Sequence, residues 1–174
     1  MKKIIALILV LISFNGLFAD ITISKDDKFV PDESMVWMGM AVDEAHDNVD
    51  AKGLPCASVL VYNKSFRSLG VTTEKATSIE TAIAMSRLSS LENTDIYTVN
   101  EPTSEEYNAI CKAGADVVYF ANPKEEVIKA GVYTAEDYDE AKIDTTLRQV
   151  TIVQVDYDVA KDLLKYYLSK KNKL

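Results

Sequence analysis

Hydrophobic side chains recur along this chain with two different periods, and each period indicates a different element. At 35–49 the apolar positions are spaced alternately three and four residues apart, which predicts an amphipathic helix. Two short apolar runs follow at 57–62 and 66–71. Only Asn63, Lys64 and Ser65 separate these runs, so the pair predicts a β-hairpin.

The rest of the chain alternates helix and strand signals with short connections. Thr77 or Ser78 is a suitable N-cap for the first of these helices, and Gly114 and Gly131 are suitable C-terminal stops for the next two. The expected elements are a helix at 78–88, a strand at 95–99, a helix at 103–113, a strand at 117–120, a helix at 123–131, an extended segment at 150–155 and a last helix from Asp156 or Asp158. This order predicts an α/β domain: a three-layer α-β-α sandwich with helices on both sides of a mixed sheet.

The first residues are typical of a secretory signal peptide. A basic start at Lys2 and Lys3 precedes an unbroken apolar run at 4–12, and Ala19 offers a small residue at the cut. We therefore expect cleavage after residue 19, a periplasmic or secreted location and no membrane attachment of the mature chain. An uncleaved anchor is the alternative interpretation, but the apolar run is short for a membrane span.

Beyond the signal peptide the chain divides simply. We expect an N-terminal extension at 20–34, one domain at 35–169 and a basic tail at 170–174. The chain has 174 residues and a formal net charge of −8, which is enough length for one domain with a substantial core. The acidic balance argues against a nucleic-acid partner, because phosphate binding relies on clustered lysine and arginine.

The cysteines and the single histidine carry little chemistry by themselves. Cys56 and Cys111 would meet an oxidising compartment after export, so a disulfide is one interpretation. Each lies beside apolar residues, so two buried free thiols are the other. His46 lies next to the apolar stripe of the first helix, and no second histidine exists to share a metal or relay a proton.

Four segments occur in an order and at a spacing that point to a family. They are 54–61, 78–80, 96–106 and 115–121, which read LPCASVLV, SIE, IYTVNEPTSEE and ADVVYFA. Together they resemble the cytidine-deaminase-like superfamily, and within it the guanine deaminase and tRNA adenosine deaminase branch. The resemblance runs from about Met35 to Tyr167. It implies a five-stranded mixed sheet and, since family members commonly pair, a homodimer.

The departures from the family pattern concern the zinc site. In this family a histidine and two cysteines hold zinc, and a glutamate that is not a ligand moves the proton. The corresponding positions here are Ser78, Thr103 and Glu106, so the resemblance implies that the ligands are lost and that zinc is absent. Glu80 keeps the catalytic proton-shuttle position. Without the metal, its expected role is that of a first-turn residue that caps the helix with Thr77.

Three functions follow from this comparison. The first is an exported, zinc-less pseudoenzyme that binds a small ligand in a vestigial pocket, where two carboxylates would suit an amine or a hard cation. The second is a protein-interaction or periplasmic assembly module with the old pocket filled and with Tyr133 and Tyr138 in the contact. The third is an active nucleobase deaminase with Glu80 and an unusual metal site through Glu106. The expected pocket comprises Thr72, which corresponds to a substrate-contacting asparagine, and Ser78, Glu80, Thr103 and Glu106.

Overall fold

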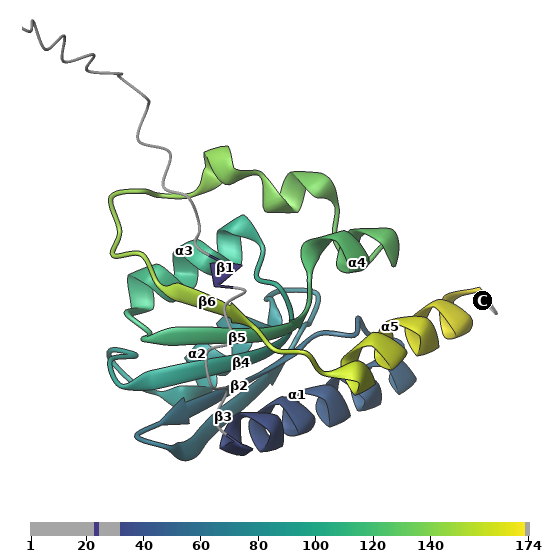
Figure 1. Ribbon diagram of the computed structural model, residues 1–174, viewed down its shortest axis with the longest axis horizontal. Coiled ribbons are helices and arrows are strands. Elements are labelled where there is room, and N and C mark those ends of the chain that lie inside the picture. Colours follow the sequence, from purple (N-terminus) through teal and green to yellow (C-terminus); the bar gives the residue numbers. More distant parts are fainter. Residues whose placement is uncertain (1–22, 25–31, 173–174) are drawn as a thin grey trace, which may run out of the picture.

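A computed structural model describes residues 23–24 and 32–172, and a central sheet in it separates two layers of helices (Figure 1). The expected signal peptide at 1–19 lies outside the described residues. The strand order is β1-β6-β5-β4-β2-β3. The strands are β1 (Ile23–Ser24), β2 (Ala57–Tyr62), β3 (Ser65–Val71), β4 (Thr94–Asn100), β5 (Val117–Asn122) and β6 (Thr151–Gln154).

The sheet is mixed, as the sequence predicts. The hairpin strand β2 pairs antiparallel with both β3 and β4, whereas β4, β5 and β6 run parallel to one another. These five strands are the expected ones. The two-residue strand β1 adds to them: it lies in the expected N-terminal extension and pairs parallel with β6.

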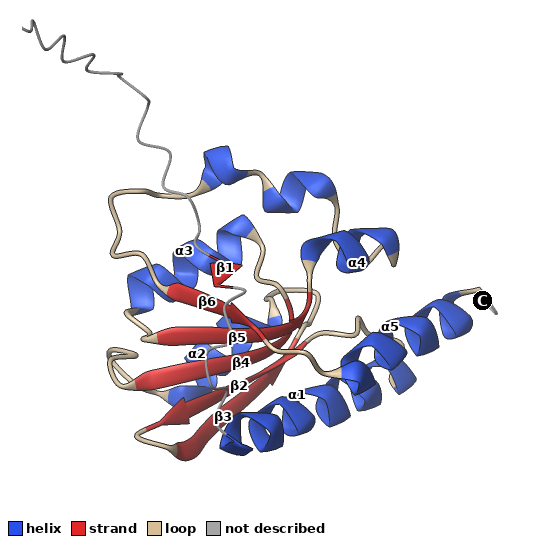
Figure 2. Ribbon diagram, viewed as in Figure 1, coloured by secondary structure: helices blue, strands red, loops and turns tan. Residues whose placement is uncertain are grey.

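Helices cover both faces of the sheet (Figure 2). They are α1 (Asp32–Asp50), α2 (Ser78–Ser86), α3 (Ser104–Ala113), α4 (Lys124–Lys129) and α5 (Asp158–Lys171), with two 3-10 turns at Ala135–Tyr138 and Glu140–Lys142. Helices α1 and α5 lie side by side on one face, and α2 and α3 lie on the other. Helix α1 begins three residues before Met35, and α5 continues into the segment expected as a basic tail.

Two helices end earlier than the sequence indicates. Helix α2 stops at Ser86 because Arg87 adopts the left-handed conformation at φ 55°, which ends the hydrogen-bonded ladder before Leu88. Helix α4 stops at Lys129, and Gly131 turns the chain away at φ 66°. Glycine tolerates this conformation without a steric penalty, which explains its place here.

The alternation of side chains along the strands produces two cores. Val59 and Tyr97 face α1 and pack with its apolar stripe, whereas Leu60, Ile96 and Val118 face α2 and α3. A third cluster joins α4 to α5. Its buried members are Cys56, Val127, Ala130, Val132 and Leu164.

The two cysteines lie in different clusters. Cys56 belongs to the third cluster and Cys111 to the core beneath α3, and both thiols are free and buried. This arrangement matches the free-thiol interpretation of the sequence, and the disulfide alternative is not formed. In the described part of the chain, no helix combines the length and the apolar character that a membrane crossing needs.

Candidate functional site

Helix α2 begins with a reciprocal cap. The backbone N–H of Thr77 donates to Oε2 of Glu80 at 2.9 Å, and the N–H of Glu80 donates to Oγ1 of Thr77 at 3.3 Å. Each side chain thereby satisfies a backbone donor that the helix leaves without an intrahelical partner. The carboxylate expected at the proton-shuttle position is therefore bound to its own helix N-terminus.

Helix α3 begins in the same way, but its cap is buried. The N–H of Thr103 donates to Oε2 of Glu106 at 2.9 Å, and the N–H of Glu106 donates to Oγ1 of Thr103 at 3.2 Å. Glu106 is only 3% exposed. Burial penalises the charged carboxylate and raises the pKa of Glu106 to about 7, although the bonds from Thr103 oppose this shift.

Ser78 stands in a chain of buried hydroxyl groups. Its Oγ lies 2.8 Å from Oγ of Ser58, which donates to Oγ1 of Thr98 at 3.0 Å. Because Ser58 has a single hydroxyl proton, Ser78 is the donor in the first of these bonds. The N–H of Ser78 donates to Oγ1 of Thr72 at 3.1 Å, so the structure brings these two expected pocket residues together.

The charge of Glu106 also acts on three further buried or half-buried side chains. They are Cys56, Tyr133 and Tyr138. Burial raises the pKa of the Cys56 thiol to about 12, and it also raises the pKa of both phenols; the negative charge of Glu106 adds to each shift. These residues are far apart in sequence, so only the folded chain reveals that they share one environment.

Tyr133 and Tyr138 do not form an exposed contact surface. Their rings meet edge to face, with centroids 6.2 Å apart, and both residues are half-buried against the third cluster. The hydroxyl of Tyr138 donates to the backbone carbonyl of Glu101 at 3.1 Å. The two tyrosines therefore pack the loop after α4 onto the domain. This is loop packing within the chain and not a contact with another protein.

The residues at the family's zinc positions do not fit zinc. The hydroxyl groups of Ser78 and Thr103 are neutral and already hydrogen-bonded, and Glu106 supplies one carboxylate in place of two thiolates and an imidazole. Over residues 23–24 and 32–172, no group of three or more His, Cys, Asp and Glu side chains could hold a metal ion. No step of a reaction can be assigned to a metal at these positions.

Three of the five expected pocket residues, Ser78, Thr103 and Glu106, are buried, and Thr72 and Glu80 are partly exposed. Three cavities lie among residues 48–171 of the described chain, and none of these three is lined by Ser78, Glu80, Thr103 or Glu106. Thr72 is the exception among the expected pocket residues, because it lines the cavity of about 690 Å³ beside the ends of α1 and α5.

Comparison with known proteins gives matches only at the level of structure. No protein-family profile matches the sequence, and no curated protein sequence matches it. A guanine deaminase from Nitrosomonas europaea superposes with a TM-score of 0.65 at 18% identity, over 80% of this chain and 86% of that one. The chain has the cytidine-deaminase-like fold.

Two other solved structures have a similar fold. A tRNA:A34 deaminase matches with a TM-score of 0.58 at 18% identity, over 71% of this chain and 99% of that one. RibD from Acinetobacter baumannii matches with a TM-score of 0.57 at 16% identity, over 79% of this chain and 39% of that one. The fold that the sequence resemblance implied is thus confirmed. Identities this low carry no information about activity.

Proposed function

We propose that this chain is an exported, zinc-independent protein of the deaminase-like fold that acts by binding and does not hydrolyse a nucleobase. One observation carries the proposal: Glu80 and Glu106 both turn back onto the N-termini of their own helices. In each residue Oε2 accepts a backbone N–H, which commits that oxygen to the helix and favours a capping role over contact with a substrate. Export is supported by the signal-peptide pattern at 1–19.

The chemistry of deamination supports the same conclusion. The reaction needs a water molecule whose pKa is lowered by a metal, together with a carboxylate that can exchange protons with it. Ser78 and Thr103 cannot supply that metal site. Glu106 has a pKa near neutrality, which would suit a general acid or base, but its burial keeps water from it.

The contacts also favour one place for binding over another. The side chains of Glu80 and Glu106 are hydrogen-bonded at the starts of α2 and α3, so a ligand that takes these oxygens would have to displace the caps. An assembly module that uses Tyr133 and Tyr138 is not favoured, because both rings are engaged in packing. Binding outside the buried cluster therefore fits the geometry best, and the neighbouring cavity at Thr72 is the first candidate.

The test uses the chain from Asp20 to Leu174, purified after growth with added zinc. Elemental mass spectrometry should find zinc far below one ion per chain, and incubation with guanine, adenine and cytidine should release no ammonia above buffer. Glu80→Gln is the matched variant for both assays. Stoichiometric zinc together with ammonia release that Glu80→Gln abolishes would overturn the proposal.

A further inference from the structure

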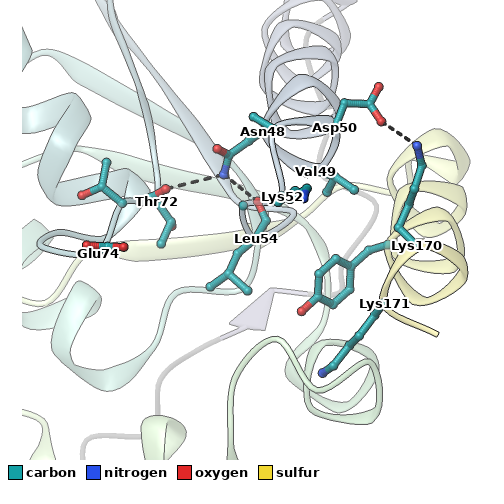
Figure 3. Close-up of a pocket in the computed structure, with 13 residues that line it drawn as sticks. Asn48, Val49, Asp50, Lys52, Leu54, Thr72, Glu74, Lys170 and Lys171 are labelled. Carbon is teal, nitrogen blue, oxygen red and sulfur yellow. Dashed lines mark hydrogen bonds and ion pairs between the residues drawn. The ribbon is translucent and has the colours of Figure 1, made fainter. Parts of the chain in front are cut away.

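The largest of the three cavities lies between the C-terminal ends of α1 and α5, beside the loops at 51–54 and 72–74 (Figure 3). Its volume is about 690 Å³. Sites for small organic molecules typically have volumes of about 300–1,000 Å³. The cavity therefore has room for a small molecule with a ring or a short apolar chain.

The wall of the cavity is apolar and fixed in position. Val49 is buried in the core between α1 and the sheet, and Leu54 and Tyr167 pack against the third cluster. These contacts restrict the motion of all three side chains. The side-chain amide of Asn48 donates to the carbonyl of Leu54 at 2.8 Å and to that of Thr72 at 3.5 Å, and thereby ties the two loops together. A wall held in this way loses little freedom when a ligand binds.

The close approach of Asn48 to the 51–54 loop reinforces this arrangement. A Cβ atom at Gly53 would lie 2.5 Å from Oδ1 of Asn48, a distance that real Cβ atoms do not show. The N–H of Gly53 also donates to the carbonyl of Asn48 at 2.7 Å. Glycine at this position lets the loop fold back against the helix end and shape one side of the cavity.

Three lysines line this cavity, although the protein as a whole carries a net charge of −8. Lys170 is neutralised, because its Nζ lies 3.0 Å from Oδ1 of Asp50. Lys171 lies 5.6 Å above the ring of Tyr167 and donates to the carbonyl of Gly131 at 3.4 Å. Within the described part of the chain, neither Lys52 nor Lys171 forms an ion pair, so both keep a charge that a ligand could balance.

The acidic residues of the cavity do not cancel these charges. Asp50 is occupied by Lys170 and by the hydroxyl of Tyr166, which donates to it at 2.6 Å. Glu74 lies on the opposite side from Lys170 and Lys171, next to Thr72 in Figure 3. The end of the cavity at α5 therefore has an excess of positive charge beside an apolar wall.

We propose that this cavity binds a small organic anion with an apolar or aromatic body. The anionic group, a carboxylate, sulfonate or phosphate ester, pairs with Lys52 or with Lys171, which lie at different places on the rim in Figure 3, and the body packs on Val49, Leu54 and Tyr167. This inference rests on the proposed function in one respect only, that the protein acts by binding a ligand. The site itself can be tested without any assumption about zinc or deamination.

The experiment measures fluorescence of two probes with the Asp20 to Leu174 chain. One probe, 8-anilinonaphthalene-1-sulfonate, carries an anion, and the other, N-phenyl-1-naphthylamine, has a similar aromatic body without the charge. The sulfonate should bind saturably at one site, and the double variant Lys52→Gln/Lys171→Gln should weaken its binding about tenfold. Binding of the uncharged probe should change little.

Two matched variants make the result specific to this cavity. Lys112→Gln removes an exposed lysine on α3 that lines none of the three cavities, and it should leave both probes unaffected. Ala51→Trp places a bulky side chain at the exposed cavity edge and should abolish binding of both. No saturable sulfonate binding, an equal loss for both probes in the lysine double variant, or the same loss in Lys112→Gln would overturn the inference. Zinc content and ammonia release test the proposed function separately.

Discussion

The carboxylate of Glu106 accepts the backbone N–H of its own N-cap, Thr103, at 2.9 Å inside the protein. Both residues occupy positions at which the family resemblance places zinc-binding cysteines. At these positions the chain has a threonine and a glutamate that bind each other, and the bond between them closes the first turn of α3. The cap occupies Oγ1 of Thr103 and Oε2 of Glu106, so the stability of this helix depends on the two side chains that stand where the resemblance places metal ligands.

Glu106→Gln should remove a pH dependence of stability. The pKa of Glu106 is raised from 4.5 to about 7 in the folded protein, mainly by burial. The folded state therefore binds more protons than the unfolded state between these values. The stabilisation from protonated Glu106 is complete below about pH 4.5 and is lost as the pH rises through about 7. The free energy of unfolding thereby falls by about 3 kcal/mol.

Urea unfolding from pH 5 to pH 8 measures this effect. The glutamine side chain keeps an acceptor for Thr103 and has no proton to lose, so the variant should exceed the wild type in stability at pH 8 and approach it at pH 5. Glu105→Gln, an exposed neighbour on the same helix turn, is the control. Parallel pH profiles for wild type and Glu106→Gln would contradict the prediction.

Thr103→Ala should destabilise the protein by about 1 kcal/mol, because it removes the acceptor for the N–H of Glu106. Thr103→Ser retains the hydroxyl and should recover most of that loss. Chemical denaturation at pH 7 measures both values. Equal stabilities for the alanine and serine variants would show that the cap contributes nothing and would weaken the structural role assigned to this position.

Ser58→Ala tests the buried hydroxyl chain. Oγ of Ser58 joins Ser78 and Thr98, so its removal leaves two buried hydroxyl groups short of a partner. A cost of about 1–3 kcal/mol follows from the unmet hydrogen bonds. Ser65→Ala, at an exposed position of β3, is the comparison and should change stability little. The prediction fails if the two variants unfold at the same denaturant concentration.

The elements of this fold could be predicted because local rules determine them. The apolar spacing at 35–49 identifies α1, and the runs on either side of Asn63 identify the hairpin. Threonine followed three residues later by glutamate indicates the starts of α2 and α3. The two-residue strand β1 was missed, because it depends on pairing with β6, more than a hundred residues away, and not on a pattern of its own.

The site was predicted less completely than the fold. Residues that share a motif, such as Ser78 and Glu80, could be named in advance. Cys56 lies in the segment 54–61 that carries the resemblance, whereas Tyr133 was expected in a surface contact, because its place near Glu106 depends on how the third cluster packs. The cavity at the ends of α1 and α5 was missed for the same reason, because its lining comes from three separate parts of the chain at 48–54, 72–74 and 167–171.

Gly70→Ala should be the most damaging of these single substitutions, because β3 and α2 touch backbone to backbone at this residue. A Cβ atom at Gly70 would lie 2.3 Å from the backbone nitrogen of Ala82 and 2.4 Å from the carbonyl oxygen of Ser78. Neither atom can move without displacing α2, so we expect a loss of about 3 kcal/mol or more. The displaced helix would also disturb the cap at Thr77.

Gly39→Ala, inside α1, provides the contrast to this prediction. Its Cβ would lie 3.2 Å from the hydroxyl oxygen of Tyr157, which is the far end of a side chain that can shift. Alanine also favours the helix over glycine by about 1 kcal/mol, so this variant should match or exceed the wild type. Thermal unfolding of the two variants side by side decides the matter. If Gly70→Ala unfolds at the wild-type temperature, then β3 and α2 do not approach each other at Gly70 as closely as the structure shows.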